Sequence, residues 1–265
     1  MKKKFLKILF IGDIIGKPGR QAVSQLLPDL KKKLDIDFVI ANVENAAGGF
    51  GVTPNIANEL CELGINCLTS GNHIWDKKEI FDYLDKSNNI LRPANYCNGV
   101  SGTGARVFEI KTGEKIGVIN LAGLVFMTSL ESPFYVALRE IEKLKKETNI
   151  ILIDFHAEAT SEKIALGWFL DGKVSAIIGS HTHVQTADER ILPQETAYIT
   201  DAGMTGPFDS VIGSEKNIIL KKFLTQIPIK YEVAKEDIKL CGVVVKIDAI
   251  SGKSLEIKRI QIPLN

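Results

Sequence analysis

The segment FLKILFIGD (5–13) joins a short apolar run to a glycine and an aspartate at its carboxyl end. An apolar run of this length is typical of a buried strand. A Gly/Pro loop follows through Gly19, and apolar residues then recur at helical spacing from Arg20 to Leu34. A strand, a polar loop and a helix in this order predict an α/β fold wherever the order repeats along the chain.

The order repeats in the first half of the chain. A second strand is followed by NVEN (42–45), and a third strand is followed by GNH (71–73). Proline opens the intervening helix, a position where its missing N–H is tolerated. The elements expected in this half are the strand Phe38–Ala41, the helix Pro54–Leu63 and the strand Cys67–Thr69.

The second half continues the alternation and then changes character. The expected elements are a hairpin of Ala105–Ile110 and Lys115–Leu121, the helix Tyr135–Glu147, the strand Ile150–Phe155, the helix Glu162–Asp171, the strands Ala176–Ile178 and Ala197–Thr200, and a final hairpin of Lys239–Asp248 and Leu255–Ile262. This late hairpin favours two packed sheets flanked by helices over a simple doubly wound fold. We find no repeat or linker, so we expect a single domain, 1–265, with a small cap-like excursion over the site around 122–135.

Composition excludes several classes of protein. Hydrophobic residues make up 45% and charged residues 25%, which are ordinary values for a globular protein. A net charge of +1 gives no electrostatic footprint for DNA. Lys7 interrupts the first apolar run, so we expect no signal peptide, and no stretch approaches the ~20 apolar residues that span a membrane. Cysteines without a C-x-x-C pair suit a reduced, cytoplasmic protein. These features of composition and charge are also compatible with a homo-oligomer.

The candidate functional residues share one property, because each directly follows a predicted strand. They are Asp13, Glu44, Asn72, His73, His156, His181 and His183. In open α/β proteins this end of the sheet is where ligands bind. One histidine alone is more often structural, but here every histidine of the chain lies at that end. Gly12 and Gly71 are expected to let the chain turn sharply beside these residues.

The donor types favour a centre with two metal ions. Histidine, carboxylate and amide oxygen suit Zn, Mn or Fe, while the lack of a nearby cysteine argues against an iron–sulfur or thiolate zinc site. His181 and His183 lie on one loop and can address one metal or two neighbouring metals. A two-metal site needs a bridging carboxylate, and Glu44 is placed for that role. Asn72 supplies a neutral carbonyl oxygen.

Three other motifs could indicate a different kind of site, and each lacks a residue that its site would require. GGFG (48–51) lacks the Gly-Lys-Ser/Thr of a phosphate-binding loop. HTHVQ (181–185) lacks an aspartate two residues after its second histidine, which disfavours a β-lactamase-like metallohydrolase. Ser180 precedes the first of these histidines, but no G-x-S-x-G elbow occurs, so a serine hydrolase is not supported.

The ordered motifs resemble those of the calcineurin-like metallophosphoesterases, whose series reads D-x-H, G-D, G-N-H-[DE], H and G-H-x-H. Ile15 stands where the first motif has histidine, and Glu44-Asn45 replaces Gly-Asp. Both departures resemble the bacterial YmdB-type branch of 2′,3′-cyclic nucleotide phosphodiesterases. HTHVQTADERILP (181–193) and DAGMTGP (201–207) also resemble that branch, and the resemblance covers nearly the whole chain.

The resemblance implies a four-layer α/β/β/α sandwich of two mixed sheets and two metal ions, iron or manganese, with zinc as a further candidate. One metal would take Asp13, Glu44, Asn45 and His183. The other would take Glu44, Asn72, His156 and His181. Asn45 would replace the histidine missing at Ile15. His73 would stay uncoordinated for acid–base work, and Asp76 is its expected hydrogen-bond partner.

The implied reaction is hydrolysis of small nucleotides or other phosphodiesters, with 2′,3′-cyclic nucleotides as the first candidates. Two cations about 3.5–4 Å apart would make a hydroxide available at neutral pH. His73 would protonate the leaving ribose oxygen. Two alternatives stay open: a phosphomonoesterase or phosphoprotein phosphatase, and a nucleotide-sensing regulator with little turnover. No set of residues for reading a base is recognisable.

Overall fold

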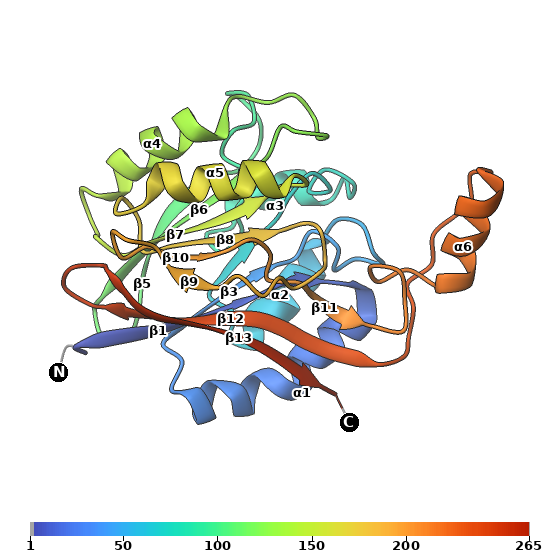
Figure 1. The fold of residues 1–265 in the computed structure, drawn as a ribbon, viewed down its shortest axis with the longest axis horizontal. Coiled ribbons are helices and arrows are strands. Elements are labelled where there is room, and N and C mark those ends of the chain that lie inside the picture. Colours follow the sequence, from blue (N-terminus) through green and yellow to red (C-terminus); the bar gives the residue numbers. More distant parts are fainter. Residues whose placement is uncertain (1–2, 265) are drawn as a thin grey trace.

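The computed structural model describes residues 3–264, and within them the strands form two mixed sheets with helices on both outer faces (Figure 1). The first sheet has the order β2 (Asp13–Ile14), β11 (Met204–Pro207), β12 (Ile238–Asp248), β1 (Phe5–Ile11), β3 (Phe38–Asn42) and β4 (Cys67–Thr69), with β13 (Ser254–Pro263) also paired to β12. The second has the order β5 (Ala105–Glu109), β6 (Lys115–Ala122), β7 (Ile151–His156), β8 (Ala176–Ser180), β10 (Ala197–Ile199) and β9 (Arg190–Ile191).

Each sheet contains a parallel core, and this core positions the site. β1, β3 and β4 run parallel in the first sheet, and β12 lies antiparallel to β1. β6, β7, β8 and β10 run parallel in the second, with β5 and β9 antiparallel to their neighbours. Parallel strands end at the same edge of a sheet, so the polar residues that follow them are brought together there.

The alternation of side chains along β1 explains the layers. Leu6, Ile8 and Phe10 pack into a core shared by the two sheets, whereas Leu9 and Ile11 pack on the opposite face. That opposite face is covered by α1 (Gly16–Leu34) and α2 (Pro54–Glu62), while α4 (Pro133–Leu144) and α5 (Thr160–Leu170) cover the second sheet (Figure 1). The four-layer α/β/β/α sandwich of two mixed sheets is therefore confirmed.

The start of α1 corrects one prediction. The sequence suggested a loop through Gly19, but the helix already begins at Gly16. Pro18 lies in its first turn, where a proline is tolerated because the first N–H groups of a helix have no partner within it. The glycines and the proline of residues 16–19 suggested a loop, but these residue types are also tolerated where a helix begins.

α6 (Lys216–Thr225) differs from the other helices, and the sequence did not predict it. Figure 1 shows it projecting away from the two packed sheets. Ile219 is buried, but Leu220, Phe223 and Leu224 are exposed. The short helix α3 (Ile80–Lys86) was also missed. Over residues 3–264, no helix is both long and apolar enough to cross a membrane.

Candidate metal centre

Glu44 lies at the centre of the site, two residues beyond the end of β3. Its Oε1 atom is 2.9 Å from Nε2 of His156, at the end of β7 in the other sheet. That Nε2 is in turn 2.9 Å from Nδ1 of His181, in the loop after β8. The three residues offer ligand atoms that all lie within 4.8 Å of one another. The two sheets thus contribute jointly to one cluster that could hold a metal ion.

A buried network fixes the orientation of His156. Strand alternation places Asp154 and His156 on the same side of β7, between the sheets. The Ser180 hydroxyl donates to Asp154 Oδ1 at 2.6 Å, so it accepts from Nδ1 of His156 at 3.0 Å. The lone pair of Nε2 therefore faces Glu44. Burial lowers the pKa of His156 to about 4, which keeps the ring neutral and able to bind a metal at pH 7.

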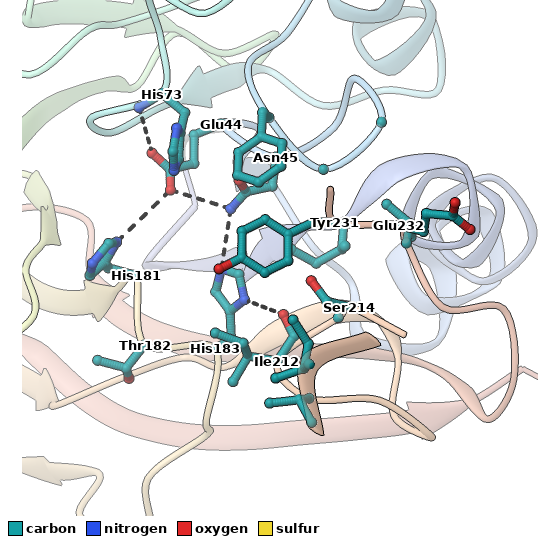
Figure 2. Close-up of a pocket in the computed structure, with 18 of the residues that line it drawn as sticks. Glu44, Asn45, His73, His181, Thr182, His183, Ile212, Ser214, Tyr231 and Glu232 are labelled. Atoms are coloured by element: carbon teal, nitrogen blue, oxygen red, sulfur yellow. Dashed lines mark hydrogen bonds and ion pairs between the residues drawn. The ribbon is translucent and has the colours of Figure 1, made fainter. Parts of the chain in front are cut away.

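A second group of donors lies on the other side of Glu44. Asn45 Nδ2 is 3.3 Å from Glu44 Oε1 and 3.1 Å from His183 Nε2 (Figure 2). His183 Nε2 also lies 4.0 Å from Oδ1 of Asp13. The other ring nitrogen, Nδ1, donates to the Ile212 carbonyl at 2.8 Å, so the lone pair of Nε2 is directed at this group.

Two oxygens of the predicted ligand set lack hydrogen-bond partners although they are buried. Among the described residues, Asp13 Oδ1 and Asn72 Oδ1 have none. Leaving such an atom unsatisfied costs about 1–3 kcal/mol, and more for a charged group. Burial raises the pKa of Asp13 well above its usual range, and the charges of Asp201 and Glu44 raise it further. Both oxygens belong to the predicted ligand set, and a bound cation would satisfy them.

The pKa of Glu44 is shifted in the opposite direction to that of Asp13. Burial alone would raise its pKa, but the neighbouring histidines, His156 foremost, hold the pKa of Glu44 well below its usual range. A fully buried carboxylate that stays ionised is suited to contact cations on both sides. The donor set therefore fits metal ions by its chemistry.

The histidine loop has a strained backbone. His181 and His183 have φ values of 94° and 65°, and Ile212, which accepts the hydrogen bond of His183, has a φ of 48°. Such conformations cost about 1–3 kcal/mol each and persist only where the surroundings enforce them. Strain of this kind clusters at functional sites.

A buried ion pair holds this loop, and sequence reasoning missed it. Lys163 Nζ on α5 donates to Asp201 Oδ2 at 2.8 Å and to the Ser180 carbonyl at 2.7 Å. Asp201 also accepts from the backbone N–H and hydroxyl of Thr182, at 3.1 and 2.7 Å. The position of Asp201 after a predicted strand was an available signal, but Lys163 carried none.

The two site glycines are required for close packing. A Cβ at Gly71 would lie 2.2 Å from both Glu44 Oε2 and His156 Cδ2, and one at Gly12 would lie 1.9 Å from the Gly203 carbonyl. Neither glycine has a positive φ. The chain does turn after Gly71, where the Ile74 N–H donates to the Gly71 carbonyl at 3.4 Å. Neither position needs the conformational freedom of glycine; glycine is needed at both because other groups approach the backbone closely.

His73 lies beside the metal donors with its side chain engaged elsewhere. Its backbone N–H donates to Glu44 Oε2 at 3.3 Å, while its ring Nδ1 is 2.9 Å from Asp76 Oδ2. The expected contact with Asp76 is thus present. The Phe50 ring meets the His73 ring edge-on at 5.0 Å between centroids.

Two hollows flank the centre. One has a volume of about 470 Å³, and its wall includes Phe50 and Phe223. Tyr231 lines the same hollow (Figure 2). The other, of about 440 Å³, lies where residues 126–128 approach Asn72 and His181. The excursion expected around 122–135 therefore borders the site, and its role as a cap stays a prediction.

Comparisons with known proteins agree with this geometry. The model of the YmdB-like protein family matches residues 9–260. The chain is 49% identical over 257 residues to the 2′,3′-cyclic-nucleotide 2′-phosphodiesterase of Bacillus subtilis strain 168, covering 97% of each chain. The resemblance inferred from the motifs is thereby confirmed.

Solved structures show the same fold. A hypothetical protein from Thermus thermophilus superposes with a TM-score of 0.92 at 38% identity, covering 98% of this chain and 100% of that one. A novel phosphatase from Mycoplasma pneumoniae also gives 0.92, at 36% identity and with 99% and 95% covered. Sequence, fold and site together show that this chain belongs to the YmdB-like family.

Proposed function

We propose that this chain is a dinuclear-metal phosphodiesterase that hydrolyses 2′,3′-cyclic nucleotides. The proposal is carried by the cluster of Glu44, His156 and His181, together with two buried oxygens of the predicted ligand set, Asp13 Oδ1 and Asn72 Oδ1, that have no hydrogen-bond partner among the described residues. Such groups are suited to two metals that share one carboxylate.

The proposed ligand sets follow the geometry and the family resemblance. One metal would be held by Asp13, Glu44, Asn45 and His183. The other would be held by Glu44, Asn72, His156 and His181. The Asn45 amide nitrogen faces Glu44 and His183, so a half-turn of the amide would present its oxygen to the first metal. When bound, the metals would supply a hydroxide nucleophile at neutral pH and offset negative charge on the phosphate oxygens.

His73 is the proposed proton donor to the leaving oxygen. Asp76 holds Nδ1, which leaves Nε2 to carry the proton that is transferred. His73 is anchored through its backbone to Glu44, which would keep the proposed acid next to the metals and the phosphate that they bind.

The substrate class rests on the curated relative. The Bacillus subtilis protein is named for 2′,3′-cyclic nucleotides and for the 2′ bond. Transferred to this chain, the name implies that the 2′ oxygen leaves and a nucleoside 3′-phosphate is formed. His73 would then protonate the ribose 2′ oxygen.

A phosphomonoesterase is the second candidate, because the Mycoplasma pneumoniae structure is described as a novel phosphatase. A nucleotide-sensing regulator with little turnover is the non-enzymatic candidate. The presence of His73 and Asp76 beside the donor groups favours an enzyme over a regulator, since a sensor needs no proton donor.

Turnover measured together with metal content tests the proposal. Adenosine 2′,3′-cyclic phosphate, adenosine 3′,5′-cyclic phosphate, bis-p-nitrophenyl phosphate and p-nitrophenyl phosphate would be compared after loading with Fe, Mn or Zn. We expect the 2′,3′-cyclic diester to have the highest kcat/KM and to yield the 3′-phosphate. Faster hydrolysis of the monoester would support the phosphatase, and metal-loaded protein without turnover of any substrate would support the regulator.

The proposal extends to metal identity and location. Nitrogen and oxygen donors of this kind accept iron, manganese or zinc, and we favour iron or manganese. None of the four cysteines, all within residues 3–264, forms a disulfide, which supports a reducing compartment such as the bacterial cytoplasm.

A further inference from the structure

Phe50 and Tyr231 form an aromatic wall next to the catalytic centre. Phe50 meets His73 at 5.0 Å between ring centroids, and Tyr231 lies beyond Phe50 at 6.1 Å with a 40° angle between the rings. His73, Phe50 and Tyr231 thus form a continuous row that starts at the proposed proton donor. Figure 2 shows Tyr231 reaching over the cavity beside Asn45 and His183.

The wall belongs to a cavity of suitable size and character. Its volume of about 470 Å³ falls within the range typical of small-ligand sites. Phe50 keeps 36% of its surface exposed, and Tyr231 is only partly buried, so each ring retains surface that a ligand could cover. Phe223 of α6 lines the same cavity and is 75% exposed. Large apolar side chains that line a polar reaction centre and stay exposed mark a binding surface.

The wall has no role in the chemistry described above. Its residues offer neither a metal ligand nor a proton donor suited to the leaving oxygen. Packing between loops explains the contact between Phe50 and Tyr231, but it does not explain why α6 extends from the body and adds exposed Phe223 to the same cavity. A flat apolar ligand would bury these surfaces together.

We propose that Phe50 and Tyr231 form a stacking subsite for the nucleobase of the substrate, with Phe223 of α6 at its outer edge. This inference deepens the proposed function and rests on it. In a nucleotide one ribose joins the reacting phosphate to the base, and here the metal donors and the aromatic wall line one cavity, so both parts of such a ligand could be accommodated together. Stacking on aromatic rings tolerates different bases because every base presents a π face. The subsite therefore selects nucleotides over phosphodiesters without a base, and discriminates weakly among bases.

Direct binding tests the subsite without depending on turnover. The Kd values of adenosine 3′-monophosphate and of glycerol phosphate, which has no base, would be measured by calorimetry on the metal-loaded protein. Wild type should bind the nucleotide at least about tenfold more tightly, and Tyr231→Ala should lose most of that preference. Tyr231→Phe, which keeps the ring, should retain it.

Tyr135→Ala is the matched control, since Tyr135 on α4 is 72% exposed and lies outside the cavity. This variant should keep the wild-type preference for the nucleotide.

Phe223→Ala is a second, independent test of the outer edge of the subsite. It should also weaken nucleotide binding more than glycerol phosphate binding. An unchanged ratio of the two Kd values in Tyr231→Ala would overturn the subsite. Failure of wild type to hydrolyse any 2′,3′-cyclic nucleotide would instead overturn the proposed function, so the two failures are distinguishable.

Discussion

At the residue scale, Glu44 connects both halves of the site. It contacts His156 directly, and Asn45 and the backbone of His73 as well. Glu44→Gln keeps the size of the side chain and removes its charge. Loss of an outer partner of a metal ligand typically weakens metal binding about 10- to 100-fold. Because we assign Glu44 to both metals directly, we expect a larger loss at each, measured as metal content after dialysis. Two fully retained metals with normal turnover would remove Glu44 from the bridge.

Asn45 is the residue that we assign in place of the histidine absent at Ile15. It lies 3.1 Å from His183 and on the opposite side of Glu44 from His181. Asn45→Ala should therefore release one of the two metals well before the other when chelator is added. Equal retention of both metals in a chelator titration would show that this assignment is wrong.

His73 should act on the leaving group and not on metal binding. General acid catalysis contributes roughly 10²–10⁴-fold to the rate. His73→Ala should lose about this much with a cyclic nucleotide, and much less with bis-p-nitrophenyl phosphate, whose leaving group needs no proton. Both metals should remain bound. If His73 only steadies its loop, the two substrates would slow equally and the thermal midpoint would fall.

The sequence could propose candidate site residues because each follows a strand, and strands are recognisable from their apolar runs. The structure brings Glu44, His156 and His181 together, and the roles of all the candidates stay predictions. The sequence could not give the reason for Gly71, since the close approach of Glu44 and His156 depends on contacts between distant segments. Nor could it identify Tyr231, because the segment that carries it has no regular secondary structure to predict.

At the element scale, the loop after β8 is held by α5 through the buried pair of Lys163 and Asp201. Removing one partner of a buried pair typically costs about 3–5 kcal/mol, because the other charge is left uncompensated. We expect Lys163→Met to lower the free energy of unfolding by about this much and to reduce turnover, since Thr182 and its two histidine neighbours lose their anchor.

An exposed ion pair provides the control for that change. Lys115 and Glu147 lie 3.0 Å apart, with 42% and 55% of their side chains exposed. Pairs of this kind are worth about 0–1 kcal/mol. Lys115→Met should therefore change the stability, measured by chemical denaturation, by less than about 1 kcal/mol and leave turnover unaffected. A similar effect of both lysine variants would contradict the role assigned to Lys163.

Elements were predictable where they are long or periodic. The hairpin of β12 and β13 and the strands β1, β3 and β7 match their predicted positions. The short strands β2, β9 and β11 were missed because none of them contains an apolar run, whereas the equally short β4 and β10 are mostly apolar. α6 was missed because its exposed apolar residues, such as Leu224, do not follow the pattern of a helix packed on a core.

At the scale of the whole molecule, the resemblance to the metallophosphoesterases predicted the four layers correctly. Composition and hydrophobic pattern alone reached only two packed sheets flanked by helices. We keep the proposal of a single domain, which is supported by the core that β1 and β3 of one sheet share with β7 and β8 of the other. The site draws on both sheets, so their packing is also what assembles the metal donors.

The most direct test of the central claim is to titrate metal into chelator-treated protein while following hydrolysis of adenosine 2′,3′-cyclic phosphate. Two metals that share Glu44 predict that activity stays near zero at low loading and reaches its maximum at two equivalents of metal per chain. The thermal midpoint should rise over the same range, because a ligand that binds only the folded state stabilises it. Full activity in the metal-free protein, or a maximum already reached at one equivalent, would contradict the account.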